Sequence, residues 1–166
     1  MVLGALFMAL MSGCASKLTA SHLVVKPWED GGSLKIFGKF MHFDLTTQPG
    51  DGGHLVKGTA WPIKENIPLW ADTAEDLSLF AYLCDEKGNV LATAQKHYPT
   101  QKITASGFPF EMTLATKTTP SGGFFVAMGY RVMFTASKPP TQGGQGSGGI
   151  SGNFVFFANE QAAVAK

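Results

Sequence analysis

The stretch Phe124-Phe125-Val126-Ala127-Met128-Gly129-Tyr130-Arg131-Val132-Met133-Phe134 decides the fold class of this chain. Large apolar side chains occupy every second position along it, namely Phe124, Val126, Met128, Tyr130, Val132 and Phe134. Successive side chains of a strand point to opposite faces, so this period of two predicts a β-strand with one buried face. Because no convincing apolar period of 3.6 residues occurs in the chain, we predict an all-β protein.

A β-hairpin is predicted upstream of this strand, over residues 77–94. Apolar positions alternate along 77–84, and the turn that follows contains Gly88, a residue suited to a left-handed conformation. A further strand is predicted over residues 108–114. One of its faces is strictly apolar and consists of Phe108, Phe110, Met112 and Leu114. Strands at this spacing indicate an antiparallel β-sandwich, a two-layer fold of the immunoglobulin or transthyretin kind.

The other segments fit the same architecture. We expect one strand over residues 33–45, apolar on both faces, followed by a Gly- and Pro-rich turn at 48–53. A second strand is expected over 54–63 and the last one over 153–159. The only helical turn expected within the domain lies over residues 70–76.

The N-terminus has the pattern of a secretion signal. An apolar run over residues 2–10 is followed by Met11-Ser12-Gly13-Cys14. The run is too short for a transmembrane helix, which needs roughly 20 apolar residues. The placement of Cys14 after Ser-Gly resembles the lipobox of bacterial lipoproteins, which implies cleavage before Cys14 and its acylation. The alternative is a buried N-terminal strand or helix in which the cysteine is incidental.

These patterns give an expected domain organisation. We expect one domain of ordinary size, carried on a lipid anchor. The expected parts are a signal peptide at 1–13, an acylated cysteine and tether at 14–32, a β-sandwich at 33–159 with a Gly-rich loop at 141–152, and a tail at 160–166 that ends in a short helix.

Composition excludes several classes of function. Hydrophobic residues make up 45% of the chain and charged residues 15%, which is typical of a protein with a packed core. The net charge of +1 provides no field for phosphate groups, so we expect no nucleic-acid partner. If Cys14 is acylated, Cys84 has no partner for a disulfide, and we predict that it is a buried apolar side chain.

Residues 56–159 resemble the YbaY/YscW family of small bacterial lipoproteins, which includes type III secretion lipoprotein chaperones, or pilotins. The matching segments are Val56-Lys57-Gly58-Thr59-Ala60, Ile67-Pro68-Leu69, residues 77–83, residues 90–94, Phe108-Pro109-Phe110-Glu111-Met112, Tyr130-Arg131-Val132 and residues 154–159. The resemblance implies a lipid-anchored periplasmic β-sandwich that acts by binding, with no catalytic residues. Ala15 stands where inner-membrane retention would require Asp, which favours the outer membrane.

No motif for catalysis or for a metal site emerges. The four histidines lack metal-type spacing, and the adjacent Met41 and His42 would point to opposite faces of a strand, so they could not hold one copper ion. Glu75 and Asp76 indicate a solvated turn, and no Gly-x-Ser-x-Gly motif or phosphate-binding Gly-Lys-Ser/Thr is present. We therefore expect no enzyme activity, no metal, no cofactor and no small-molecule substrate.

The aromatic residues are the remaining candidates for a binding site. The chain has 13 Phe and three Trp, and Phe124 and Phe125 cannot both face the core. Trp61, Trp70 and Phe125 are the candidate binding residues, although capping by the N-terminal segment would explain outward aromatics equally well. We expect an outer-membrane lipoprotein that faces the periplasm and binds an envelope or secretion protein. The alternatives are a structural or polysaccharide-binding lipoprotein and a small enzyme or metal carrier.

Overall fold

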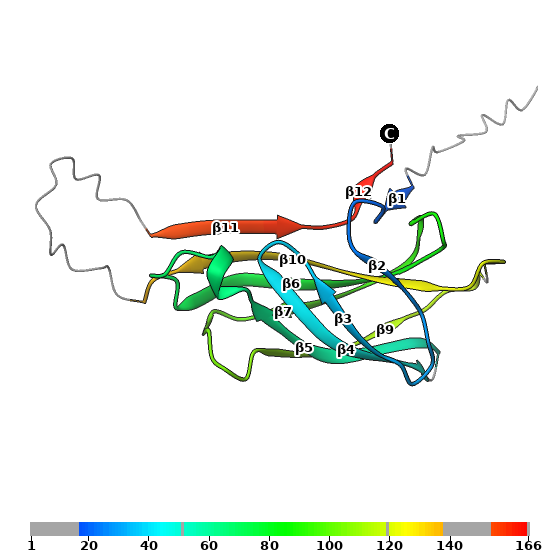
Figure 1. The fold of residues 1–166 in the computed structure, drawn as a ribbon, viewed down its shortest axis with the longest axis horizontal. Helices are drawn as coiled ribbons and strands as arrows, with labels where there is room; N and C mark the ends of the chain where they lie inside the picture. Colours follow the sequence, from blue (N-terminus) through cyan, green and yellow to red (C-terminus); the bar gives the residue numbers. More distant parts are fainter. Residues whose placement is uncertain (1–16, 51, 119, 138–153, 166) are drawn as a thin grey trace, which may run out of the picture.

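The computed structural model describes residues 17–50, 52–118, 120–137 and 154–165. Within them the chain is almost entirely β, and its only helix is a single 3-10 turn, η1 (Lys64–Asn66). Two antiparallel sheets pack face to face, as Figure 1 shows. The predicted all-β sandwich is therefore confirmed.

The larger sheet has six strands and the other has four. The order of the larger sheet is β11 (Val155–Glu160), β10 (Phe125–Thr135), β6 (Thr73–Cys84) and β7 (Val90–Tyr98), with β2 (Val25–Pro27) beside β10 and β8 (Gln101–Lys102) beside β6. The order of the four-stranded sheet is β3 (Ser33–Phe37), β4 (Met41–Gly50), β5 (Gly53–Pro62) and β9 (Phe108–Leu114). The two-residue strands β1 (Leu18–Thr19) and β12 (Ala163–Val164) pair with each other.

The core lies between the two sheets and follows the predicted alternation. Along β9, all four residues of the apolar face are buried and the three between them are exposed. On β10, the inward residues Val126, Tyr130, Val132 and Phe134 are fully buried. Burying a large apolar side chain contributes roughly 1.5–3 kcal/mol, so this shared layer is the main source of stability.

β6 begins at Thr73, before the start at residue 77 that the sequence predicted, and it contains a β-bulge. The register with β10 shifts between Arg131 and Met133, and Asp76 has a positive φ of 49°. The extra residue allows Ala74 and Leu77, which have opposite parity in the sequence, to face the same core. The prediction of a helical turn over residues 70–76 is wrong. The strand already begins at Thr73, and the single helical turn of the described residues is η1.

Residues 33–45 form two strands and not the single strand expected. The chain reverses at Gly38, whose N–H donates to the Met41 carbonyl at 2.9 Å, and β3 and β4 then pair as a hairpin. This reversal explains why both parities are apolar: Ile36 faces the core from β3, and Phe43 faces it from β4. Phe37 is consequently left outside, with 57% of its surface exposed.

Part of the expected tether belongs to the folded domain. β2 pairs with β10, and Leu23 and Val25 pack with Phe125 in a small second core on the outer face of the six-stranded sheet. The C-terminal tail contains β12 where a short helix was expected, because it pairs with β1 from the other end of the chain. Cys14 and the Gly-rich loop at 141–152 lie outside the described residues.

Candidate functional site

Three aromatic rings stack across the outer face of the four-stranded sheet. Phe37 on β3 pairs with His42 on β4, and His42 pairs with Trp61 on β5. The ring centroids of Phe37 and His42 are 5.6 Å apart with an interplanar angle of 25°, and those of His42 and Trp61 are 5.2 Å apart at 16°. We call these three residues the ring ladder. Cross-strand neighbours lie about 5 Å apart, which is a stacking distance, so the sheet itself sets the spacing of the rings.

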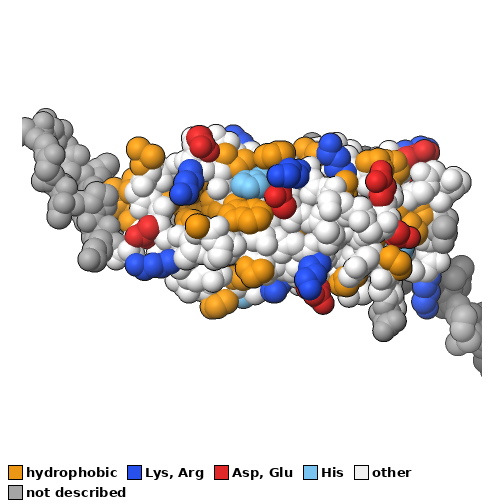
Figure 2. All heavy atoms as spheres, turned by 60° about the horizontal axis from the view of Figure 1, so that its bottom comes forward, with side chains coloured by type: hydrophobic (Ala, Val, Ile, Leu, Met, Phe, Trp, Pro, Cys, Tyr) orange, Lys and Arg blue, Asp and Glu red, His pale blue; other side chains and the backbone are white. Residues whose placement is uncertain are grey.

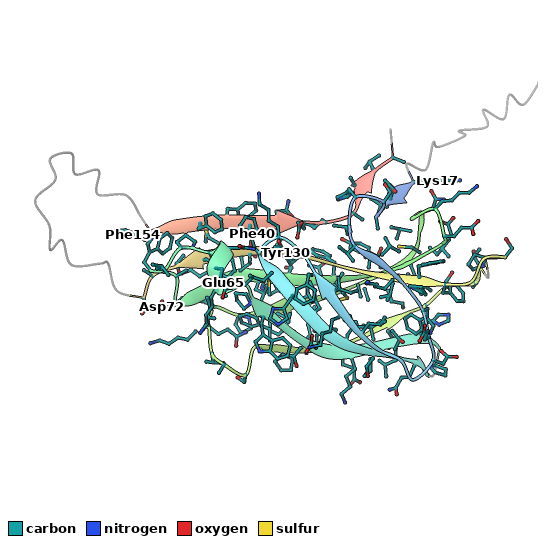
Figure 3. All side chains as sticks on the ribbon, viewed as in Figure 1. Lys17, Phe40, Glu65, Asp72, Tyr130 and Phe154 are labelled. Carbon is teal, nitrogen blue, oxygen red and sulfur yellow. The ribbon has the colours of Figure 1, made fainter. Side chains whose placement is uncertain are left out.

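The ring ladder forms the floor of a groove of about 510 Å³. Its walls are the segment after β5, residues 62–65, and the loop before β9, residues 103–105. Figure 2 views the protein from the side of the four-stranded sheet and shows hydrophobic side chains gathered around a histidine, with charged side chains of both signs at their border. Lys64, Glu65 and Thr104 contribute polar groups to the lining, and Glu65 is labelled on η1 in Figure 3.

The loop before β9 holds the Trp61 ring in place. The Trp61 Nε1–H donates to the Ala105 carbonyl at 3.1 Å. Gly107 allows this approach because its φ is +64°, and a Cβ there would lie 2.6 Å from both Trp61 Nε1 and the Ala60 carbonyl oxygen. With Trp61 fixed on one side and His42 stacked against it, the ladder is organised before any ligand arrives.

Two ion pairs lie on the rest of the same sheet face. Lys35 and Asp44 form an ion pair of 3.3 Å across β3 and β4, and Lys57 and Glu111 form another of 3.3 Å across β5 and β9. Exposed pairs of this kind contribute at most about 1 kcal/mol to stability, so their main effect is to keep the surface hydrophilic. An apolar ligand would therefore be directed to the ladder end of the sheet.

The three aromatic residues singled out from the sequence lie in different places. Trp61 is part of the groove. Trp70 packs edge-to-face on Phe154, with ring centroids 5.5 Å apart, near the start of β11. Phe125 is half-buried in the second core, capped by the N-terminal segment.

Sequence reasoning missed two members of the ladder, Phe37 and His42. The expected single strand over residues 33–45 placed them on one continuous strand, where no cross-strand contact is foreseen. The signal in the sequence was that the apolar positions change after Gly38 from even numbers (34 and 36) to odd numbers (41, 43 and 45). Such a change indicates a hairpin.

Cys84 and the adjacent Met41 and His42 are the residues for which the sequence raised a thiol or copper site. Burial raises the pKa of the Cys84 thiol to about 12, so the thiolate is scarce at neutral pH. Met41 is fully buried on the inner face of β4 while His42 lies on the outer one, so the two cannot share an ion. Among residues 17–50, 52–118, 120–137 and 154–165, no three or more His, Cys, Asp or Glu side chains cluster as a metal site would require.

A cluster of hydrogen bonds around the buried Tyr130 fixes the β3–β4 turn against the six-stranded sheet. The Tyr130 hydroxyl accepts the Phe40 N–H at 3.0 Å and bonds to the Glu160 carboxylate, which also accepts the Lys39 N–H at 2.8 Å. Asn66 donates from Nδ2 to the Lys39 carbonyl at 2.6 Å. Burial raises the pKa of Tyr130, and the adjacent Glu160 raises it further, so the phenol keeps its proton. The cluster holds the turn from which Phe37 and His42 diverge.

Comparison with protein-family models, with curated proteins and with solved structures found no significant match. In the described part of the chain, no helix has the length and hydropathy that crossing a bilayer requires.

Proposed function

We propose that this protein is a non-catalytic binding module, anchored through an acylated Cys14 to the periplasmic face of a bacterial outer membrane. The observation that carries the binding role is the groove floored by the ring ladder of Phe37, His42 and Trp61. Its ligand is an apolar or aromatic side chain on an extended segment of another envelope or secretion protein. The resemblance to YbaY/YscW lipoproteins supports a chaperone or pilotin role for that interaction.

The edge of the four-stranded sheet supports an extended ligand. In the described residues, β3 pairs only with β4, so no strand is hydrogen-bonded to its other edge. Strand addition supplies affinity through main-chain hydrogen bonds and specificity through pockets for alternate side chains. Phe37 lies at the end of β3 that meets the groove, so a strand added to β3 runs directly to the ring ladder.

The stacked rings explain how such a groove can bind without a large entropic cost. Aromatic pairs contribute about 0.5–1.5 kcal/mol beyond the burial of their area. Because Trp61 is already held by Ala105, few rotamers are lost when a ligand side chain enters.

Photocrosslinking in intact cells tests the binding role. A photoreactive residue is placed at Phe37, which is 57% exposed, and in a matched control at Val164, which is also 57% exposed but lies on β12. We expect a protein adduct from position 37 and none from position 164. Equal adducts from both positions, or none from position 37, would refute the groove as the binding site.

The anchor is tested separately. Cys14→Ala is expected to abolish labelling by a radioactive fatty acid and to release the protein into the soluble periplasmic fraction. If the Cys14→Ala protein still partitions with membranes, the anchor proposal is wrong, whatever the crosslinking result.

A second candidate is binding of an envelope polysaccharide. It is favoured by the combination of planar rings with the polar side chains of Lys64, Glu65 and Thr104 in one groove, since sugar rings present both C–H faces and hydroxyl groups. Cosedimentation with purified cell-wall polysaccharide distinguishes it. Binding that Phe37→Ala abolishes would favour the polysaccharide, whereas a protein adduct in cells without such binding favours the protein ligand.

A further inference from the structure

The edge strand β11 carries an exposed apolar surface distinct from the groove. Phe154, Val155 and Phe157 are 38%, 45% and 58% exposed, and Leu69 beside Trp70 is fully exposed. Trp70 packs on Phe154 at the start of β11, and Val155 and Phe157 are exposed further along the same strand. Figure 1 shows β11 as the outermost long strand of that sheet, and Figure 3 labels Phe154 at its start.

The edge of β11 lacks the features that normally prevent strands from pairing between molecules. Natural edge strands are protected by charged side chains, Pro or bulges. Residues 154–159 contain no charge and no Pro, and the register with β10 runs without a shift from Val155 to Glu160. Glu160, at the end of β11, is engaged by Tyr130 and by the Lys39 N–H, and Arg131, opposite Asn159 on β10, is paired with Asp76.

The end strand β3 of the four-stranded sheet provides a contrast. β3 carries Lys35 at its centre, and Lys39 follows in the turn. Two copies pairing through β3 would bring these charged side chains together, including Lys35 with its ion-pair partner Asp44, whereas residues 154–159 of β11 carry no charge. Self-association is therefore disfavoured at β3 and unopposed at β11.

We propose that two copies of this chain pair through antiparallel β11 strands and form one continuous sheet across a two-fold axis. A register centred on Phe156 places Val155 of each copy opposite Phe157 of the other, on the outer face. It keeps Glu160 beyond the paired residues. The same surface serves both copies, as a two-fold interface requires. Phe157 gains an apolar neighbour in addition to Met133, its partner on β10.

The dimer is expected to be weak in solution. Stable interfaces bury about 1,200–2,000 Å² in total, and a pairing of five residues per strand buries less, so we expect a dissociation constant of about 10⁻⁵ to 10⁻⁴ M. Confinement of both copies to one membrane through Cys14 would raise their local concentration and favour the pair.

Sedimentation equilibrium of the full chain with Cys14→Ala, across this concentration range, tests the proposal. We expect a monomer–dimer equilibrium that Phe157→Lys weakens at least tenfold. Val164→Lys is the matched control, because Val164 is equally exposed on a different strand, and it should leave the equilibrium unchanged. Circular dichroism verifies that both variants keep their β structure.

Cysteine crosslinking in cells tests the register. In the anchored protein with V155C and F157C, mild oxidation should yield a dimer, since directly opposed strand residues have the Cα separation that a disulfide needs. Cys84 is buried and does not provide a competing thiol. A chain that stays monomeric throughout the range, or a dimer that Phe157→Lys leaves intact, would overturn the proposal. Crosslinking only to a different protein would overturn it as well.

Discussion

Replacing Tyr130 by Phe isolates the hydroxyl group that ties the β3–β4 turn to the opposite sheet. The Tyr130 side chain is fully buried, and its ring packs against Phe43 with centroids 6.3 Å apart. A Phe ring preserves that packing. What is lost is the oxygen that accepts the Phe40 N–H at 3.0 Å and that bonds to the Glu160 carboxylate. Figure 3 shows Phe40 and Tyr130 together beside the turn.

The loss of stability follows from the two groups that lose the hydroxyl as a partner, the Phe40 N–H and the Glu160 carboxylate. An unpaired buried N–H costs about 1–3 kcal/mol, and a hydrogen bond to a charged group contributes about 1.5–3 kcal/mol. Because Glu160 keeps its bond to the Lys39 N–H, part of the second contribution survives. We therefore expect Tyr130→Phe to lower the free energy of unfolding by about 2–4 kcal/mol, a large share of the 5–15 kcal/mol typical of a domain.

Urea unfolding followed by tryptophan fluorescence measures this loss. Tyr98→Phe is the control, because the Tyr98 hydroxyl donates to the Pro109 carbonyl, at 2.7 Å, and has no charged partner among the residues that the structure describes. Its removal should cost about 1 kcal/mol. If Tyr130→Phe costs no more than Tyr98→Phe, the hydroxyl does not clamp the turn and our account of this cluster is wrong.

Three further predictions concern the acid stability, the groove and the thiol. Side-chain and backbone hydrogen bonds from Ser137 lower the pKa of Asp72 from 3.8 to about 2, so its contribution to stability is present above about pH 4 and disappears as the pH falls towards 2. An NMR titration of the carboxyl group should show this pKa, and a midpoint near 4 would contradict it. Gly107→Ala should destabilise the protein by about 2 kcal/mol or more, because the left-handed backbone and the close contacts both oppose a Cβ. It should also shift the fluorescence emission of Trp61. Unchanged emission and stability would show that the loop adapts. Cys84 should react with a thiol reagent at pH 8 only after unfolding, and rapid labelling of the native protein would contradict its burial and raised pKa.

The long strands could be predicted because their signal is local. β9 alternates buried and exposed residues with a period of two, and β10 carries a large apolar side chain at every second position. Both patterns depend only on the geometry of an extended chain. The bulge in β6 could not be foreseen in the same way. Its effect is to reverse the parity between Ala74 and Leu77, and the sequence carries no mark of where the partner strand skips a residue.

The candidate site depended on contacts that are distant in the sequence. Trp61 was identified because large aromatic residues on a strand are conspicuous, but its neighbours in the groove were not. Phe37 and His42 join it only because the chain turns at Gly38, and that turn is held by Tyr130 and Glu160 from the other sheet.

Alternation, turn residues and composition thus determined by themselves that this chain forms an antiparallel β-sandwich with a buried thiol at Cys84. Tertiary structure alone decided which aromatic rings meet, that the N-terminal segment caps Phe125, and which strands, β3 and β11 among them, stand at the ends of the sheets. The physical reason is that a strand's faces follow from its own dihedral angles, whereas neighbours across strands follow from pairing and register, which the whole fold selects.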